Sequence, residues 1–465
     1  MSVSFVSSPI FTRHFSPAEY GDYTLVFITF NYLSILTLTW ISSSFWRFYP
    51  KYKNTEKIRA LYSSIFYLIF SSLILIFVFT IILYSGYSNV QIKRLIVFAF
   101  LNIITTEMLN IINIPLRYEG RARFYNTVNI IKSVASFSLL LILTFVYNQG
   151  IESFLISTSV VNFILIIAIV TLVKGQYWYR LPKPDFALIK EVFDYGKSGM
   201  LANVGLLILV NSDRYIIGIF NDKNSVGIYN QLYNIAQLSV ASIINIFFAA
   251  INPSFLNVLE NKKHEQNLIT AKFYVLFSLI LIPVTVYFSL FTKEICHIML
   301  GERFRVGESF LPAIMFSSLL YGYTLFHEAK LKFNNRISKV VIGMLLAGLL
   351  NLALNFIVLP HHSFLYASLT TLVSYLFLFI FLFQFDDFRI RELFEYKNMY
   401  IRIALILGIE TIIYFALKWQ IGWKEIHIGL SIIEGLIFSA IYFILIYFSG
   451  SYKSLIKNLS LYHPI

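Results

Sequence analysis

The chain has 465 residues, of which 58% are hydrophobic and only 13% are charged, and its mean hydropathy is +0.72. This composition excludes an ordinary soluble domain. The net charge of +13 is spread over short loops, which argues against a nucleic-acid-binding patch. Cys296 is the only cysteine, so an internal disulfide and a multi-cysteine metal site are both excluded.

Apolar runs of about 20 residues, the length that a helix needs to cross a bilayer, recur along nearly the whole chain. We expect thirteen spans, near residues 23–46, 60–84, 95–116, 124–147, 153–173, 196–220, 227–251, 271–292, 308–328, 338–360, 363–385, 400–418 and 426–448. Lys and Arg concentrate in alternate loops, which the positive-inside rule assigns to the cytoplasm together with the C-terminus. Because all loops are short, we expect no catalytic domain outside the membrane and no enzymatic activity.

The first half of the chain resembles the second. Glu19-Tyr-Gly-Asp-Tyr23 and Ser225-Val-Gly-Ile-Tyr229 each open a span, and Leu116–Arg121 and Leu331–Arg336 each precede one. The two offsets are nearly equal, and each pair enters the membrane from the same predicted side. This pattern predicts a parallel repeat of two six-helix lobes.

The repeat predicts three segments in this all-α protein. The N-terminal lobe would cover 1–182, the C-terminal lobe 183–385, and an extra helix pair with a cytoplasmic tail 386–465. Only 20 residues precede Gly21, whereas the corresponding helix of the second lobe begins about 30 residues before Gly227. The first helix is therefore expected to be truncated, with Ser7 and Ser8 at the positions that correspond to Asp213 and Arg214.

The first lobe contains several polar groups in apolar surroundings. Glu107 lies in mid-span and is a candidate for ion coupling, or a partner for Lys132. Lys132 follows Asn126 and Asn129, and the spacing places most of this group on one helix face. Lys132 is a candidate for holding an anion, or a lysine that extends to the headgroups. Arg117 is a candidate for the substrate path, although the topology signal alone explains it.

Asp213 and Arg214 are adjacent within the apolar run from Gly199 to Phe220. Ionised side chains are costly at membrane depth and usually face a bundle interior or a hydrated cavity. We expect Arg214 to attract an anionic substrate and Asp213 to bind a coupling ion. The alternative is a structural tie between helices, and the two side chains, about 100° apart, need not pair with each other.

A polar stripe follows Gly227. Asn230, Asn234, Gln237 and Asn245 lie at steps of four, three and eight residues, so they share one helix face. They either line the path or bind neighbouring helices together. Later in the chain, Asp386 and Asp387 stand beside Arg389 and Arg391, and we expect a solvated ionic loop there.

Several motifs resemble those of the oligosaccharide-lipid flippases of the multidrug/oligosaccharidyl-lipid/polysaccharide exporter superfamily, which include O-antigen transporters. The resemblance extends from about residue 12 to 450. It rests on Phe15–Tyr23, Pro184–Lys190, Gly227-Ile-Tyr229, Leu300–Phe304 and Asn351–Pro360. Two features depart from the family pattern, namely the truncated first helix and His361-His-Ser-Phe364.

The resemblance implies that the chain flips undecaprenyl-diphosphate-linked oligosaccharide repeat units for surface polysaccharide of the O-antigen or capsule type. The location would be a bacterial or archaeal cytoplasmic membrane. The partners would be membrane lipids, a polysaccharide polymerase and chain-length machinery. No metal, cofactor or nucleic acid is expected, and a proton or sodium gradient is the candidate energy source. The alternatives are a multidrug or small-solute exporter of the same fold, and a membrane polysaccharide polymerase or ligase.

Overall fold

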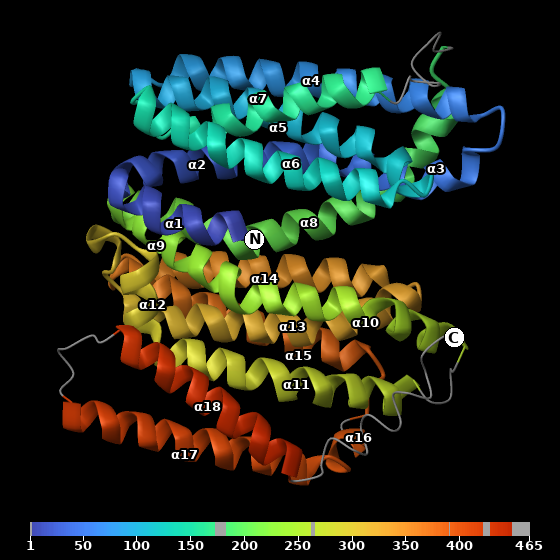
Figure 1. Cartoon of the computed structure of the whole chain (residues 1–465). Coiled ribbons are helices and arrows are strands. Elements are labelled where there is room, and N and C mark those ends of the chain that lie inside the picture. The colour runs from blue at the N-terminus through green and yellow to red at the C-terminus, as the bar shows by residue number, and fades with distance from the viewer. Residues whose placement is uncertain (1, 173–182, 262–265, 390, 422–427, 449–465) are drawn as a thin grey trace. The chain divides into compact units, whose positions relative to one another are not determined.

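The computed structural model describes residues 2–172, 183–261, 266–389, 391–421 and 428–448 (Figure 1). Within these ranges the regular elements are all helical. Among the described residues, thirteen helices, several of them continuous across a π-helical turn, are long and apolar enough to cross a membrane. The predicted all-α multi-pass fold and its thirteen spans are thereby confirmed. The predicted cytoplasmic tail, 449–465, lies outside the described residues.

Contacts divide the chain into two compact units, and each is considered by itself. Unit N comprises Phe15–Gly227, and unit C comprises Met1–His14 and Ile228–Ile465. The helices of unit N are α2 (Pro17–Ser34), η1 (Ile35–Thr39), α3 (Trp40–Tyr52), α4 (Ile58–Gly86), α5 (Val90–Tyr118), α6 (Ala122–Leu141), η2 (Ile142–Val146), α7 (Ser153–Leu172) and α8 (Phe186–Phe220). Helix α9 (Lys223–Ala236) begins in unit N and continues into unit C.

Unit C opens with α1 (Ser2–His14) and resumes within α9. Its further elements are η3 (Gln237–Ala241), α10 (Ser242–Asn261), α11 (Gln266–Leu290), α12 (Thr292–Met299), η5 (Glu302–Phe304), η6 (Glu308–Phe310), α13 (Leu311–Phe333), α14 (Ile337–Val358), η7 (Phe364–Tyr366), α15 (Ala367–Phe385), α16 (Arg391–Phe394), α17 (Lys397–Ile421) and α18 (Ile428–Phe448).

The compact units differ from the predicted sequence segments in their first helices. Helix α8, expected to open the second lobe, belongs to unit N, where the Ser44 hydroxyl of α3 donates to the Val192 carbonyl at 3.0 Å. Helix α1 belongs to unit C, where the Gly301 N–H donates to the Thr12 hydroxyl at 2.9 Å. The predicted boundary near 182 falls next to residues that the structure does not describe. The repeat therefore describes the order of the helices along the chain, whereas in the structure α8 packs with the other helices of unit N.

The starts of α2 and α9 meet at the two glycines that the repeat pairs. A Cβ on Gly21 would lie 2.0 Å from the Lys223 carbonyl oxygen, and one on Gly227 would lie 2.0 Å from the Pro17 carbonyl oxygen. The Lys223 ammonium also pairs with Asp22 at 2.7 Å. Glycine is thus required at both positions because the two backbones approach too closely for any side chain.

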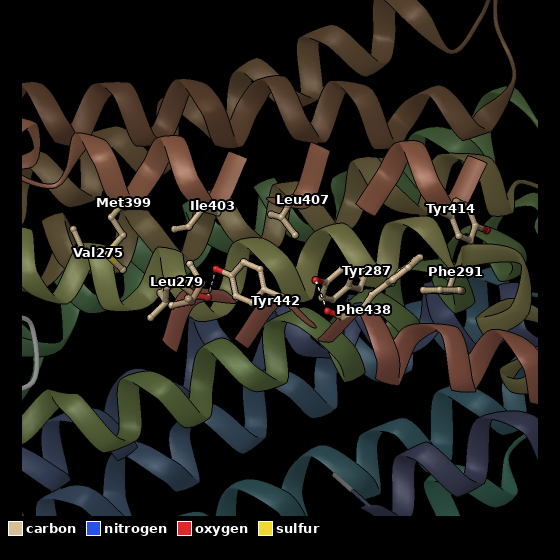
Figure 2. Packing of buried hydrophobic residues seen from close by; sticks show 11 residues of the cluster. Val275, Leu279, Tyr287, Phe291, Met399, Ile403, Leu407, Tyr414, Phe438 and Tyr442 are labelled. Atoms are coloured by element: carbon tan, nitrogen blue, oxygen red, sulfur yellow. Dashed lines mark hydrogen bonds between the residues drawn. The ribbon is translucent and has the colours of Figure 1, made fainter. Parts of the chain in front are cut away.

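The C-terminal helices α17 and α18 pack in unit C against α11. Figure 2 shows their apolar contact, in which the Tyr442 hydroxyl donates to the Leu279 carbonyl at 2.9 Å and the Tyr287 hydroxyl donates to the Phe438 carbonyl at 3.3 Å. Tyr287 also donates to the Glu410 carboxylate at 2.6 Å. Close packing and interhelical hydrogen bonds, the usual stabilising forces between membrane helices, therefore hold this pair in place.

Candidate substrate cavity

A polar cavity of about 410 Å³ lies within unit N, between α3, α5, α6 and α8. Its lining contains two cations and no carboxylate. The polar and aromatic lining residues are Ser42, Ser43, Trp46, Asn110, Asn113, Arg117, Tyr125, Asn129, Lys132 and Tyr195. Because a cavity with this lining is positively charged and rich in hydrogen-bonding groups, it suits an anionic, hydroxylated ligand.

The turn between α5 and α6 brings the two cations to the same cavity. Gly120 takes a left-handed conformation, with φ +74°, and this is the usual way to end a helix beyond its last turn. Arg117 occupies the last turn of α5. Tyr125, Asn129 and Lys132 follow on α6 at steps of four and three, so they lie along one face of that helix.

Arg117 is held by aromatic rings and not by a carboxylate. Its guanidinium carbon lies 3.9 Å from the ring centre of Tyr125 and 5.2 Å from that of Trp46. The Tyr118 hydroxyl donates to the Trp46 carbonyl at 3.0 Å, which fixes α3 beside the end of α5. In the described part of the chain the guanidinium has no ion pair, so its N–H edge is available for a bidentate bond to an oxyanion.

Lys132 supplies the second positive charge. The residue is half-buried, and its ammonium makes no hydrogen bond or ion pair with any residue that the structure describes. The charge that acts on it comes from Glu107, at a separation longer than an ion pair. A cation of this kind provides a point charge for an anion that enters the cavity.

A buried amide also lacks a partner at the cavity wall. Asn113 is only 6% exposed, and its Oδ1 accepts no hydrogen bond from the described residues. Leaving such an acceptor without a donor costs about 1–3 kcal/mol. Asn129, in contrast, donates its amide N–H to the Tyr125 carbonyl at 3.0 Å. Asn113 is therefore the position where a ligand hydroxyl would gain most from donating a hydrogen bond.

Glu107 lies behind the wall of this cavity. The Ser34 hydroxyl donates to Oε1 at 3.1 Å, and the Ser42 hydroxyl, which also lines the cavity, donates to Oε2 at 3.3 Å. In a regular α-helix residues eight apart point about 80° away from each other. The wider π turn η1, Ile35–Thr39, lies between the two serines and removes most of this offset. The π turn thus lets one helix direct both hydroxyls at one carboxylate.

The structure brings together part of the predicted site. Arg117, Asn129 and Lys132 line one cavity, and Glu107 lies next to it. Asn126 is exposed and does not line the cavity. The sequence did not predict a place in the site for Ser42, Ser43, Trp46, Asn110, Asn113, Tyr125 or Tyr195. Tyr125 could have been found because it shares the helical spacing of Asn129 and Lys132, but no sequence pattern connects α3 or α8 with this cavity.

Asp213 and Arg214 pair with each other. The guanidinium donates to the Asp213 carboxylate at 2.6 Å, and the Arg214 backbone N–H donates to the same oxygen at 2.9 Å. The guanidinium also donates to the Val210 carbonyl one turn earlier. Both residues are buried, at 0% and 1% exposure, and neither lines the cavity. This geometry fits the structural alternative better than a role in attracting substrate.

The predicted polar stripe lies in unit C. Asn230 and Asn234 are half-buried and Gln237, the first residue of η3, is exposed. Asn234 donates to the Gln231 amide oxygen at 3.5 Å. Because the stripe and the cavity belong to different units, the prediction that the stripe lines the path remains a prediction.

The expectation of a solvated loop at Asp386 is wrong. Asp386 is 2% exposed, and its carboxylate contacts His327 Nδ1 at 2.5 Å and the Lys330 ammonium at 3.0 Å. Of the two aspartates, Asp387 is the exposed one, and it pairs with Arg336 at 2.8 Å. The end of α15 is buried against α13, so the first carboxylate pairs with residues about 60 positions away that the local sequence does not reveal.

Membrane-length helices that enclose a polar, cationic cavity define a multi-pass membrane transporter. The chain belongs to the family of polysaccharide biosynthesis proteins, whose profile matches residues 10–307. This confirms the resemblance to the polysaccharide exporter group. Two similar proteins come from archaea. An uncharacterized membrane protein of Methanocaldococcus jannaschii is 23% identical over 88% of this chain and 85% of its own length. A probable low-salt glycan biosynthesis flippase of Haloferax volcanii is 23% identical over 42% of this chain and 41% of its own length.

Solved structures show the same fold. The lipid II flippase MurJ in an inward closed conformation has a TM-score of 0.69, with 16% identity and coverage of 98% of this chain and 97% of that one. An inward-facing multidrug resistance transporter of the MATE family has a TM-score of 0.60, with 14% identity and coverage of 82% and 94%. At these identities the likeness establishes the fold alone.

Proposed function

We propose that this protein flips a polyprenyl-diphosphate-linked oligosaccharide repeat unit across the cytoplasmic membrane of a bacterium or archaeon, for surface glycan of the O-antigen or capsule type. The observation that carries the proposal is the pair of cations, Lys132 and Arg117, in a cavity whose lining has no carboxylate. A diphosphate needs cations along its way through about 30 Å of hydrocarbon. The family and the glycan biosynthesis flippase among its relatives support the same substrate class.

Each group of the cavity has a part in this proposal. Arg117 binds the diphosphate with two parallel N–H bonds, and Lys132 binds it as a point charge. Asn113 accepts a hydrogen bond from a sugar hydroxyl, and the half-exposed Tyr195 ring provides an apolar surface for a sugar face. The lipid tail remains in the bilayer. A polymerase that extends the chain would receive the repeat unit on the other side.

The predicted topology supports the direction of transport. The distribution of Lys and Arg assigns the loop between α5 and α6 to the cytoplasm. Arg117 lies next to this loop, so the cavity would open on the side where activated sugars are available. By the same assignment the C-terminus would be cytoplasmic.

The charge of the cavity also bears on multidrug export, since multidrug transporters share this fold. With Lys132 and Arg117 in its lining and no carboxylate there, the cavity repels organic cations. We therefore expect binding of anionic lipid-linked sugars and not of cationic drugs.

The test is flipping in proteoliposomes, with a fluorescent short-chain polyprenyl diphosphate that carries one N-acetylhexosamine. Lys132→Gln and Arg117→Gln should each slow flipping about tenfold or more, because a charge-assisted hydrogen bond is worth about 1.5–3 kcal/mol. Arg117→Lys should recover only part of the loss, since it keeps the charge without the two-pronged geometry. The matched control is Lys93→Gln, because Lys93 lies in the first turn of α5, contacts Tyr84, and is remote from the cavity. Equal flipping by all four variants would refute the proposal.

A further inference from the structure

Glu107 is an acidic group beside the proposed anion site. Its carboxylate is separated from the cavity by the Ser42 side chain, which both lines the cavity and donates to Oε2 at 3.3 Å. The charge of Lys132 acts on it from α6. Any anion that binds Lys132 therefore competes with Glu107 for the same positive charge, and the two negative charges repel each other.

The surroundings of Glu107 contain few other charges. The elements α2, η1 and α3 present hydroxyl groups, from Ser34, Thr39 and Ser42. Helix α6 presents Lys132, and Arg117 follows Glu107 by ten residues on α5, about 15 Å along the helix. The titratable groups that line the cavity beyond these are Tyr125 and Tyr195. In the described chain, Lys132 is thus the charged group that balances this carboxylate.

The hydrogen-bond network around Glu107 can accept a proton without losing a bond. When the carboxylate is ionised, Ser34 and Ser42 both donate to it. When it is protonated, its O–H can donate to the Ser34 oxygen, because the Ser34 hydroxyl can turn toward Thr39 Oγ1, 3.2 Å away. Hydroxyl groups serve as donor or acceptor, so both states of the carboxyl group are satisfied.

We propose that Glu107 is a proton-binding site linked to the anion site, so that the carboxylate takes up a proton when a diphosphate occupies Lys132. The inference rests on the proposed function, since it concerns the same cavity. In the empty cavity Glu107 and Lys132 balance each other. A diphosphate brings two negative charges to Lys132 and Arg117, and the uptake of one proton removes the repulsion that Glu107 would otherwise exert. Linkage is reciprocal, so a proton on Glu107 must strengthen anion binding by the same factor.

The experiment measures the dissociation constant of a short-chain polyprenyl diphosphate N-acetylglucosamine for the purified full chain between about pH 5.5 and 8.5. A diphosphate that is esterified at both ends has no group that titrates in this range. Any change of the dissociation constant with pH therefore comes from groups of the protein. Binding of the wild type should weaken as the pH rises, by up to about tenfold per unit where one full proton is linked. A buffer-dependent calorimetric titration should show proton uptake on binding.

The decisive variant is Glu107→Gln, which keeps the size and the hydrogen bonds of the side chain and removes its charge. It should bind the probe at about pH 8 more tightly than the wild type does, and its affinity should no longer depend on pH. A misfolded variant cannot produce tighter binding, so this result separates linkage from damage. Lys93→Gln is the control and should keep the wild-type slope.

Two outcomes would overturn the inference. The first is a pH slope for Glu107→Gln equal to that of the wild type, and the second is weaker binding by this variant throughout. Failure of the proposed function looks different, because then the wild type would not bind the glycan probe at any pH. If the wild type binds and flips the probe with no pH dependence and no proton uptake, the function stands and the linkage is wrong.

Discussion

The Asp213 carboxylate accepts a hydrogen bond from the guanidinium of its own neighbour, Arg214, across 2.6 Å in the buried part of α8. Two charges that would each be costly at membrane depth are thereby neutralised within one turn of one helix. A pair of this kind is sensitive to the removal of either partner, since the remaining charge stays buried without compensation.

We therefore predict that Asp213→Asn and Arg214→Gln each destabilise the protein by about 3–5 kcal/mol, the cost of breaking a buried pair. The double variant Asp213→Leu/Arg214→Met should recover most of this loss, because it leaves no isolated charge. The measurement is the thermal unfolding temperature in detergent, with size-exclusion chromatography as the readout of the folded fraction. Flipping by the double variant at normal protein levels would support a structural role. A double variant that is folded but does not flip would instead support a role of the pair in the substrate path.

The glycine contact between α2 and α9 predicts a second stability effect. Gly227→Ala places a methyl group where the Pro17 carbonyl oxygen would be only 2.0 Å away, so the two helices must separate. Overpacking of this kind costs about 1–3 kcal/mol. Gly218→Ala is the matched control on α8, because its Cβ would make ordinary contacts of 3.6 Å with Leu25 and Val226. Comparable unfolding temperatures for the two variants would contradict the close approach.

The unpartnered amide oxygen of Asn113 predicts a selective loss of sugar binding. Asn113→Leu should weaken binding of the N-acetylhexosamine probe about tenfold, a change of about 1.4 kcal/mol. It should leave binding of the sugar-free polyprenyl diphosphate nearly unchanged, because that molecule has no sugar hydroxyl to donate. The comparison requires both lipids and a direct binding assay. Equal losses for both lipids would show that Asn113 supports the cavity and does not contact the sugar.

The single thiol provides a probe of unit C. Cys296 on α12 is buried, and burial raises the pKa of its thiol to about 12. The thiol therefore stays protonated, and so unreactive, throughout the pH range in which the protein is handled. We predict no labelling by N-ethylmaleimide at about pH 7.5 in the folded protein, and complete labelling after denaturation. Rapid labelling of the folded chain would mean that α12 opens readily.

The sequence predicts best those features that a single helix determines. Hydropathy located the thirteen spans because the bilayer imposes a length on each helix. The spacing of Asn129 and Lys132 on α6 predicted a shared face, and the structure places both at one cavity with Arg117. Asn126 is predicted in the same group and is instead exposed, because it lies three positions before Asn129 and is turned about 60° around the helix from it.

The sequence is least informative where distant elements meet. Trp46 and Tyr195 reach the cavity from α3 and α8, and no local pattern links these helices to α6. Asp386 looked like part of a charged loop because Arg389 and Arg391 follow it, yet its partners His327 and Lys330 come from α13. The π turn η1 left no composition signal either, although it determines which serines face Glu107.

The contact between α1 and α12 has a consequence for biosynthesis. Thr12 leaves the ribosome almost 300 residues before Gly301, to which its hydroxyl is bonded in unit C. Domains generally fold as they emerge, so unit N, which is one uninterrupted stretch of chain, can assemble while translation continues. Helix α1 cannot form this contact until α12 has been made. Unit C therefore closes late, and a ribosome that stalls before α12 would leave this first helix without its place in the protein.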